Sequence, residues 1–255
     1  MLLAVDVGNS TTVVGVFEGD GLTHHWRLST VKRRTPDELA MVIAGVLALD
    51  GLELGRHVTG MVVGSVVPSA TASLREMSAR YLDVDPVVVE PGVRTGIALR
   101  HENPRDLGAD RIANAVAAQA LYGGPAIVVD FGTATSFDVV DRDGSFAGGA
   151  IAPGISTSAE ALVARAARLP TVETVAPPSP IGRTTVTALQ SGIVFGFAGQ
   201  VDGIIDRICQ ELGPGVTAVA TGGLAPAVLA ACRNLDHHDP WLTLKGLRLV
   251  WERNA

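Results

Sequence analysis

The sequence predicts an α/β protein made of two similar halves, because one pattern of strands and turns occurs twice. In the first copy, four apolar residues lead into the polar turn Asp6–Thr12, and a second apolar run follows. In the second copy, four apolar residues lead into Asp130–Ser136, again with an apolar run behind it. Short apolar runs on both sides of a polar turn are typical of a β-hairpin. We therefore expect two homologous β-β-β-α-β-α domains, over residues 1–117 and 118–255, with a last helix that can pack back on the first domain.

Each half is expected to begin with a three-strand meander and to continue with alternating helices and strands. In the first half, the expected elements cover Leu2–Val5, Thr12–Glu18, Leu22–Ser29, Pro36–Leu49, Met61–Val67, Pro68–Leu82, Pro86–Val89 and about 110–121. In the second half, strands are expected over Ala126–Asp130, Ser136–Val140, Ser145–Ile151 and Val216–Ala220, and helices over Ile155–Ala167, Val186–Leu212, Pro226–Arg233 and Thr243–Glu252. Four prolines predict a loop over Leu169–Thr184, and a solvated loop is expected at His237–Asp239.

The predicted helix over Val186–Leu212 is unusual because it is apolar on most of its circumference, which is typical of a buried helix. It also contains four glycines at three- and four-residue spacings: Gly192, Gly196, Gly199 and Gly203. Each glycine inside a helix costs ~1 kcal/mol relative to alanine. Close approach of another backbone would offset that cost, and the partner is either another part of the domain or a second subunit.

The composition argues against a nucleic-acid or membrane surface. The formal net charge is −6, and the one basic cluster, Lys32-Arg33-Arg34, is short enough to be a solvated loop. No cationic segment precedes the first apolar run, and the apolar stretch around Ser191–Val201 is too short for the ~20 residues of a transmembrane helix. Cys209 and Cys232 lack metal-site spacing and are expected to be free thiols. We expect a cytoplasmic protein that binds neither nucleic acid nor membrane.

The first polar turn has the composition of a phosphate-binding turn. It contains one carboxylate, one glycine, one amide and three hydroxyls. Glycine lets backbone N–H groups approach an anion closely, and a carboxylate suits the Mg²⁺ that accompanies nucleotide phosphates. An ordinary turn has a similar composition, so this copy alone does not decide between the two interpretations. The second copy at Asp130–Ser136 favours phosphate binding.

Two further motifs carry candidate chemistry. In Gly108-Ala109-Asp110-Arg111, the carboxylate of Asp110 stands beside a cation at the start of a predicted helix, an arrangement that suits a base that orients a hydroxyl group. A plain helix-terminal acid followed by a surface arginine is the alternative. In Thr221-Gly222-Gly223, glycines at the end of a predicted strand would let a flat base lie against the backbone. A simple β-α turn is the alternative there.

Taken in order, these motifs resemble the actin/Hsp70/sugar-kinase superfamily of phosphotransferases. The resemblance implies two ribonuclease-H-like domains of the actin-like ATPase fold, with ATP in the cleft between them. Within that superfamily, the chain is similar over essentially its full length to the type III pantothenate kinases. The segments that carry this similarity are Met1–Ser10, Gly108–Arg111, Asp130–Thr135, Gly148–Gly154, Gln190–Gly192 and Leu242–Arg248. One departure is Gly182-Arg183-Thr184-Thr185, where the family usually has Gly-Lys-Asn-Thr.

The resemblance implies ATP-dependent phosphorylation of pantothenate to 4'-phosphopantothenate, the first step of coenzyme A biosynthesis. It makes Asp110 the expected catalytic base and places pantothenate against Gly108, Ala109, Asp110, Arg111 and Thr185. The residues expected to bind ATP are Asp6, Val7, Gly8, Asn9, Ser10, Thr11, Thr12, Val13, Thr133, Gly222 and Gly223. Asp6 is expected to hold Mg²⁺ through water, and the resemblance assigns a monovalent cation, K⁺ or NH₄⁺, to Asp130. From the residues alone, a second Mg²⁺ ligand is the alternative role of Asp130.

The resemblance also implies a homodimer in which Thr185 completes the pantothenate site across the interface. Two other functions are compatible with the superfamily. A different small-molecule kinase is the first, although such enzymes generally carry larger inserted substrate domains. A non-catalytic ATP-binding transcriptional regulator is the second, although the acidic composition and the intact Asp110 oppose it.

Overall fold

The computed structural model describes all 255 residues, and they divide into two compact units. The first unit contains Met1–Ala117 together with Leu242–Ala255, and the second contains Ala118–Trp241. The boundary lies inside helix α4 (Ala109–Tyr122). The sequence predicts a second domain over residues 118–255 whose last helix can pack back on the first domain, and α7 (Leu242–Glu252) belongs to the first unit. Each unit is described separately below.

The first unit is built on a five-stranded mixed sheet with the strand order β3-β2-β1-β4-β5. Strand β1 pairs antiparallel with β2 and parallel with β4, while β3 and β5 form the two edges. The strands are β1 (Leu2–Val7), β2 (Thr11–Glu18), β3 (Gly21–Ser29), β4 (Gly60–Ser65) and β5 (Val87–Val88). Both faces of β1 and β4 are buried, which explains their nearly continuous apolar sequences.

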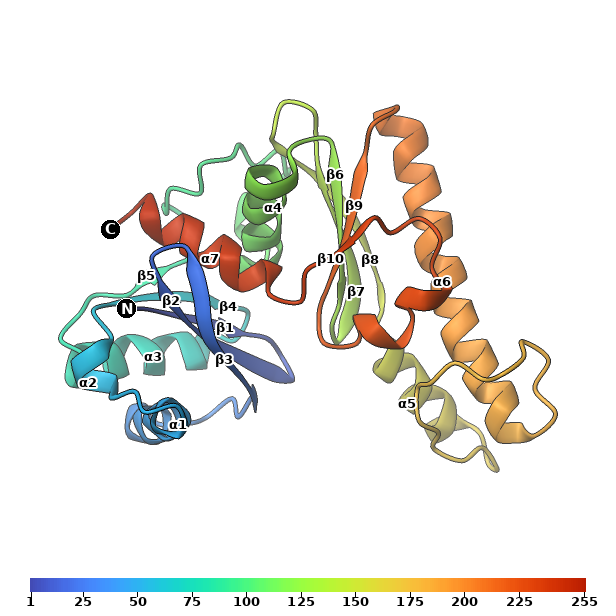
Figure 1. The fold of residues 1–255 in the computed structure, drawn as a ribbon, viewed down its shortest axis with the longest axis horizontal. Helices are drawn as coiled ribbons and strands as arrows, with labels where there is room; N and C mark the ends of the chain where they lie inside the picture. Colours follow the sequence, from blue (N-terminus) through green and yellow to red (C-terminus); the bar gives the residue numbers. More distant parts are fainter. The chain divides into compact units, whose positions relative to one another are not determined.

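Helices cover both faces of the first sheet (Figure 1). On one face lie α1 (Pro36–Leu49), α3 (Pro68–Tyr81) and the short α2 (Leu54–His57); on the other lies α7. Glycines on the strands make room for α7: a Cβ atom would lie 2.7 Å from Leu244 Cδ1 at Gly15 and 2.8 Å from Leu247 Cδ2 at Gly64. This close fit explains why the last helix packs on the first unit.

Helix α1 confirms the predicted span Pro36–Leu49. Thr35 caps it in a capping box: its side chain accepts from the Glu38 backbone N–H, and the Glu38 carboxylate accepts from the Thr35 backbone N–H at 2.8 Å. These hydrogen bonds from Thr35 lower the pKa of Glu38. The buried face of α1 carries Ala40, Ile43 and Leu47.

The second unit repeats the topology of the first. Its sheet has the order β10-β9-β6-β7-β8, in which β6 pairs antiparallel with β7 and parallel with β9. Read from its other edge, the strand order is β8-β7-β6-β9-β10. This matches the order β3-β2-β1-β4-β5 of the first sheet, with β6 to β10 in the places of β1 to β5. The strands are β6 (Ala126–Phe131), β7 (Ala134–Val140), β8 (Phe146–Pro153), β9 (Thr217–Thr221) and β10 (His237–His238). The predicted repeat and fold class are therefore confirmed.

Two predictions for the second unit are wrong. The expected helix over Pro226–Arg233 is replaced by two 3₁₀ turns, Ala225–Ala227 and Leu229–Ala231. The segment is tied at one end by the Leu224 N–H bond to the Phe131 carbonyl, and at the other by the bonds of the Arg233 and Asn234 N–H groups to a carboxylate of α6. The expected loop at His237–Asp239 instead contains β10, which adds to the sheet beside β9. Backbone pairing decides that strand, and its two exposed histidines give no apolar signal.

Helix α6 (Thr185–Leu212) covers one face of the second sheet, while α5 (Ile155–Arg165) packs near its N-terminal half (Figure 1). The inward residues include Ile193, Val194, Ala198, Val201 and Ile205. Helix α6 is long and apolar enough to cross a membrane. A single helix of this length and composition is weak evidence for a membrane span, because the core helix of a soluble protein can have the same properties. Of its most apolar 18-residue window, 33% is buried in the chain.

The glycines of α6 lie on its exposed side. Gly192, Gly196 and Gly199 are exposed, and a Cβ atom at any of them would have nothing within 4 Å. Within its own unit α6 is therefore buried on one side only, although its sequence is apolar on most of its circumference. Of the two partners that the sequence left open for this glycine stripe, another part of the same unit is excluded.

Candidate active site

The first polar turn closes tightly at the end of the β1–β2 hairpin. Asp6 pairs with Val13 across the hairpin, and Val7 pairs with Thr12. The Gly8 N–H donates to the Thr11 carbonyl at 3.0 Å, and a Cβ atom at Gly8 would lie 3.0 Å from the same oxygen. Asn9, Ser10 and Thr11 are exposed at the tip. The exposed tip of the turn therefore presents small polar residues to solvent, a composition that suits an anion-binding turn.

A residue that the sequence analysis did not single out braces this turn. Thr30, just after β3, donates its backbone N–H to the Ser10 carbonyl at 3.0 Å and its hydroxyl to the Gly8 carbonyl at 2.8 Å. Its hydroxyl also lies 2.9 Å from the Thr12 hydroxyl. The conformation of the turn is thus fixed by side-chain and backbone hydrogen bonds from the neighbouring strand.

The motif Gly108–Arg111 lies at the same end of the first sheet, where β1 terminates. Asp110 is half-buried in the first turn of α4, and its Oδ1 accepts from the Arg111 backbone N–H at 2.9 Å. A Cβ atom at Gly108 would collide with this Oδ1 and lie 3.5 Å from Val66 Cγ1. Val66 in turn donates its N–H to the Val7 carbonyl at 3.0 Å. Contacts through Val66 therefore bring the candidate base close to the end of β1 and its polar turn.

The second polar turn is one residue shorter than the first. Asp130 pairs with Ser136 and Phe131 with Thr135, so three residues connect the strands instead of four. The Gly132 N–H donates to the Ala134 carbonyl at 3.0 Å, which is the counterpart of the Gly8 bond in the first hairpin. The homologous turns therefore keep the glycine hydrogen bond and differ in their exposed tips.

The structure brings the glycine turn after β9 directly against Asp130. Gly222 has φ +92°, and a Cβ atom there would lie 2.5 Å from Asp130 Oδ1 and 2.6 Å from the Phe131 nitrogen. Both the left-handed backbone and the missing space require glycine. The Leu224 N–H donates to the Phe131 carbonyl at 3.2 Å and holds the turn in place. Two motifs some 90 residues apart in the sequence thus form one surface.

Thr133 is exposed at the tip of the second turn, and its carbonyl is held by the start of α5. The Gly154 N–H donates to it at 3.1 Å, and the Thr157 hydroxyl donates to it at 2.8 Å. A Cβ atom at Gly154 would collide with the Thr133 and Gly132 carbonyls. The sequence marked Gly148–Gly154 only by resemblance, and its physical role is this close approach to the turn.

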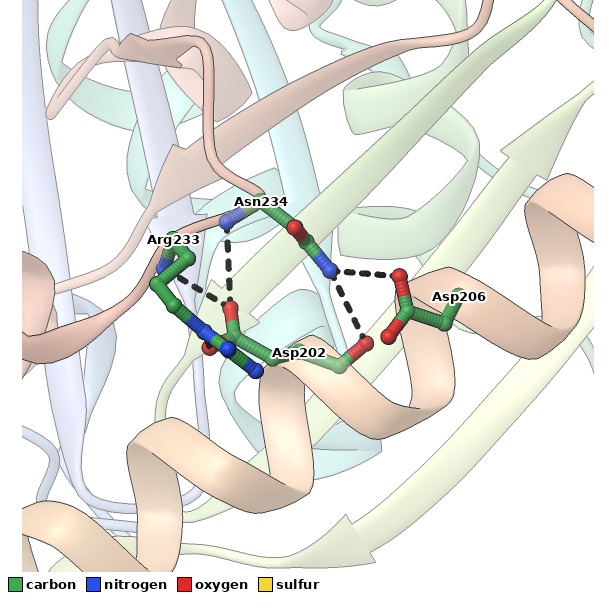
Figure 2. A network of polar contacts seen from close by, with 4 residues as sticks. All are labelled: Asp202, Asp206, Arg233 and Asn234. Atoms are coloured by element: carbon green, nitrogen blue, oxygen red, sulfur yellow. Dashed lines mark hydrogen bonds and ion pairs between the residues drawn. The ribbon is translucent and has the colours of Figure 1, made fainter.

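A buried carboxylate fixes the segment that follows the glycine turn (Figure 2). Asp202 on α6 is 3% exposed, and its Oδ1 accepts the backbone N–H groups of Arg233 and Asn234 at 2.9 and 3.1 Å. The Arg233 Nε donates to Oδ2 at 3.1 Å, and the Asn234 side chain reaches Asp206 at 2.7 Å. The Arg233 side chain is 79% exposed, so the backbone donors do most to stabilise the buried charge.

Arg183-Thr184 stands where the family usually has Lys-Asn, and this replacement is compatible with the start of α6. Thr184 is the N-cap of α6: its hydroxyl accepts from the Thr187 N–H at 3.1 Å, and the two form a capping box. Threonine and asparagine are both favoured N-cap residues, so replacing the usual asparagine preserves the helix start. Thr185 is therefore exposed in the first turn of α6, in the second unit.

The sequence was compared with known families and proteins. The profile described as type III pantothenate kinase matches residues 2–207. A type III pantothenate kinase from Streptomyces avermitilis is 54% identical over 261 residues, which cover 100% of this chain and 98% of that protein.

Solved structures show the fold. A protein from Campylobacter jejuni assigned to the Baf family of transcriptional activators superposes with a TM-score of 0.61 at 19% identity, covering 99% of this chain and 98% of that one. The activator of 2-hydroxyisocaproyl-CoA dehydratase from Clostridium difficile superposes with a TM-score of 0.58 at 11% identity, covering 99% and 95%. At these identities the superpositions support the architecture alone.

Proposed function

The chain belongs to the type III pantothenate kinase family, and from this premise we propose how its residues transfer the γ-phosphate of ATP to pantothenate. The observation that carries the proposal is the position of Asp110. Its contacts through Gly108 and Val66 place it at the end of the first sheet where the first polar turn lies. Phosphoryl transfer depends mainly on positioning and on neutralising charge, and it needs a carboxylate to receive the hydroxyl proton.

In this proposal Asp6–Val13 binds the β- and γ-phosphates through the backbone N–H groups and small side chains of the first turn. Thr133 donates to phosphate from the second turn, and Gly222 and Gly223 accommodate the adenosine. The close packing of Gly222 against Asp130 supports a common surface for base and phosphate in the second unit. The exposed tips of both turns leave their polar groups accessible to a ligand.

Asp110 orients the pantothenate hydroxyl and accepts its proton as the bond to phosphorus forms. Gly108 and Ala109 leave room for substrate beside the carboxylate, and Arg111 pairs with the pantothenate carboxylate or a phosphate, since a planar guanidinium suits both. Because the Arg111 N–H already donates to Asp110 Oδ1, the other carboxylate oxygen is the one assigned to the substrate.

The donor sets fit the two cations implied by the family. Asp6, half-buried at the end of β1, provides one carboxylate for Mg²⁺, which keeps its waters and binds the ATP phosphates. Asp130 is paired with Ser136 in the β6–β7 ladder, and no three His, Cys, Asp or Glu residues gather there or elsewhere. One carboxylate with neutral oxygens suits a weakly hydrated monovalent ion, K⁺ or NH₄⁺.

We also propose that the enzyme is a cytoplasmic homodimer. The exposed glycine stripe of α6 lets a second backbone approach closely, and no part of its own chain occupies that space. Val186 and Phe195 expose apolar side chains on the same helix, at 44% and 36%. A partner helix would cover this surface and bring its own Thr185 to the pantothenate site.

The test is ADP release by the full chain with Mg²⁺, ATP and pantothenate, in buffers containing either K⁺ or Na⁺. We expect pantothenate-dependent ADP in K⁺ and much less in Na⁺. Asp110→Asn should lower kcat by about 10²–10⁴-fold, the usual contribution of a positioned base. Absence of pantothenate-dependent ADP would refute the proposed function, and equal rates in Na⁺ would refute the Asp130 assignment alone.

A further inference from the structure

The basic segment Lys32-Arg33-Arg34 follows β3 and is attached to the first polar turn. Thr30, two residues before Lys32, makes the hydrogen bonds to Ser10 and Gly8 described above. On the other side, the Ser69 hydroxyl at the start of α3 donates to the Lys32 carbonyl at 2.5 Å. The backbone is therefore held just before the segment and at its first residue, at the end of the sheet where β1 ends.

The positive charges of this segment are available to a ligand. Lys32 and Arg33 are exposed, and neither forms an ion pair. The acids that follow in the sequence are engaged elsewhere: Glu38 closes the capping box of α1, and Asp37 accepts from Arg80 and Tyr81 at 2.7 and 2.6 Å. Arg34 interacts with the Glu38 carboxylate, so Lys32 and Arg33 are the two cations that border the turn without an acidic partner, in a chain of net charge −6.

We propose that Lys32 and Arg33 form a cationic rim that draws the nucleoside triphosphate to the first turn. The inference rests on the proposed function, because it assigns an additional binding element to the same turn. A triphosphate is a polyanion, and the overall negative charge of the protein repels it, so a local positive potential raises its concentration at the turn. The rim acts through charge at the entrance, and it leaves the proton transfer at Asp110 unaffected.

The experiment compares three full-length proteins: the unaltered chain, Lys32→Gln/Arg33→Gln, and Arg56→Glu. The last two lower the net charge by the same amount. Arg56 lies on α2, just before β4 begins. Because β4 runs parallel to β1, Arg56 lies at the end of the sheet opposite to the polar turn that follows β1. KM for ATP, KM for pantothenate and kcat are measured at about 20 mM and about 200 mM ionic strength, because salt screens exposed charges.

We expect the double variant to raise KM for ATP by about three- to tenfold at low salt, and this difference to shrink at high salt. Its KM for pantothenate and its kcat should stay within about twofold of the unaltered chain, and Arg56→Glu should match the unaltered chain in every parameter. An unchanged KM for ATP in the double variant, or an equal rise of KM for ATP in Arg56→Glu, would refute the proposed role of the cationic rim. Lack of pantothenate-dependent ADP in the unaltered chain would instead refute the proposed function.

Discussion

At the scale of single residues, several site positions depend on the absence of a side chain. Gly108 leaves the space that Asp110 Oδ1 occupies, and Gly222 leaves the space beside Asp130. The two differ in backbone: Gly222 has φ +92°, whereas Gly108 is not in the left-handed region. Alanine at Gly222 therefore introduces both strain and a clash, whereas alanine at Gly108 introduces only a clash, with the candidate base itself.

Gly108→Ala should therefore impair catalysis with little effect on folding. The new methyl group must displace Asp110, and a misplacement of about 1 Å can lower the rate by about 10²-fold. We expect kcat to fall by at least this order while the Tm changes by only a few degrees. Gly45→Ala is the matched control, since Gly45 lies in α1 with nothing within 4 Å. A Gly108→Ala protein with normal kcat would show that Asp110 does not need its present position.

At the scale of elements, both sheets present their polar turns on hairpins that are braced by neighbouring segments. Thr30 braces the first turn, and Gly154 and Thr157 brace the second. The segment that leads from the glycine turn to β10 is held by Asp202, which ties Arg233 and Asn234 to α6 (Figure 2). Helix α6 therefore fixes the C-terminal end of the segment that follows the proposed adenosine-binding turn.

Asp202→Asn tests this role of α6. An amide in place of the carboxylate leaves part of the buried donor set unpaired, which costs about 1–3 kcal/mol. We expect a lower Tm and a raised KM for ATP, with KM for pantothenate unchanged. Asp206→Asn, one turn further along and exposed, should have a much smaller effect. Equal changes in both KM values would indicate general destabilisation instead.

A second readout comes from Cys232. Burial, and then the charge of Asp202, raise the pKa of the Cys232 thiol to about 11. Since the thiolate is the reactive form, Cys232 should be alkylated slowly at pH 8 in the unaltered protein. Removing the Asp202 charge should lower this pKa and speed alkylation of Cys232, as mass spectrometry would show.

At the scale of the whole molecule, the chain repeats one five-stranded sheet topology and adds α7 to the first copy. The main feature that its own fold leaves without a partner is the exposed stripe of α6. A helix that is buried on one side and glycine-rich on the other is suited to contact with a second copy of the chain. The proposed homodimer follows from this surface.

Gly196→Leu should abolish the dimer without unfolding the chain. No atom lies within 4 Å of the Gly196 Cβ position, and replacing a helical glycine stabilises the helix by up to ~1 kcal/mol. Analytical ultracentrifugation should show a monomer, and KM for pantothenate should rise because the partner's Thr185 is lost. Gly45→Leu, on the exposed side of α1, is the control and should remain dimeric. A dimeric Gly196→Leu protein would place the interface elsewhere.

Local sequence patterns are sufficient to predict several features of this protein. The two hairpins, the helix Pro36–Leu49 and the repeated order of elements follow from apolar periodicity and turn residues, which act over a few positions. The same short-range patterns, compared with known families, indicated the pantothenate kinases. They did not reveal β10, because its two histidines join the sheet only through backbone bonds to β9.

Contacts between residues that are distant in the sequence depend on how the elements pack in three dimensions. The path from Asp110 through Gly108 and Val66 to Val7 joins three segments that are far apart in the sequence. The one-sided burial of α6 likewise depends on which face the sheet covers, whereas the composition of the helix is apolar nearly all round. Packing selects these contacts after the elements form, so no local pattern encodes them.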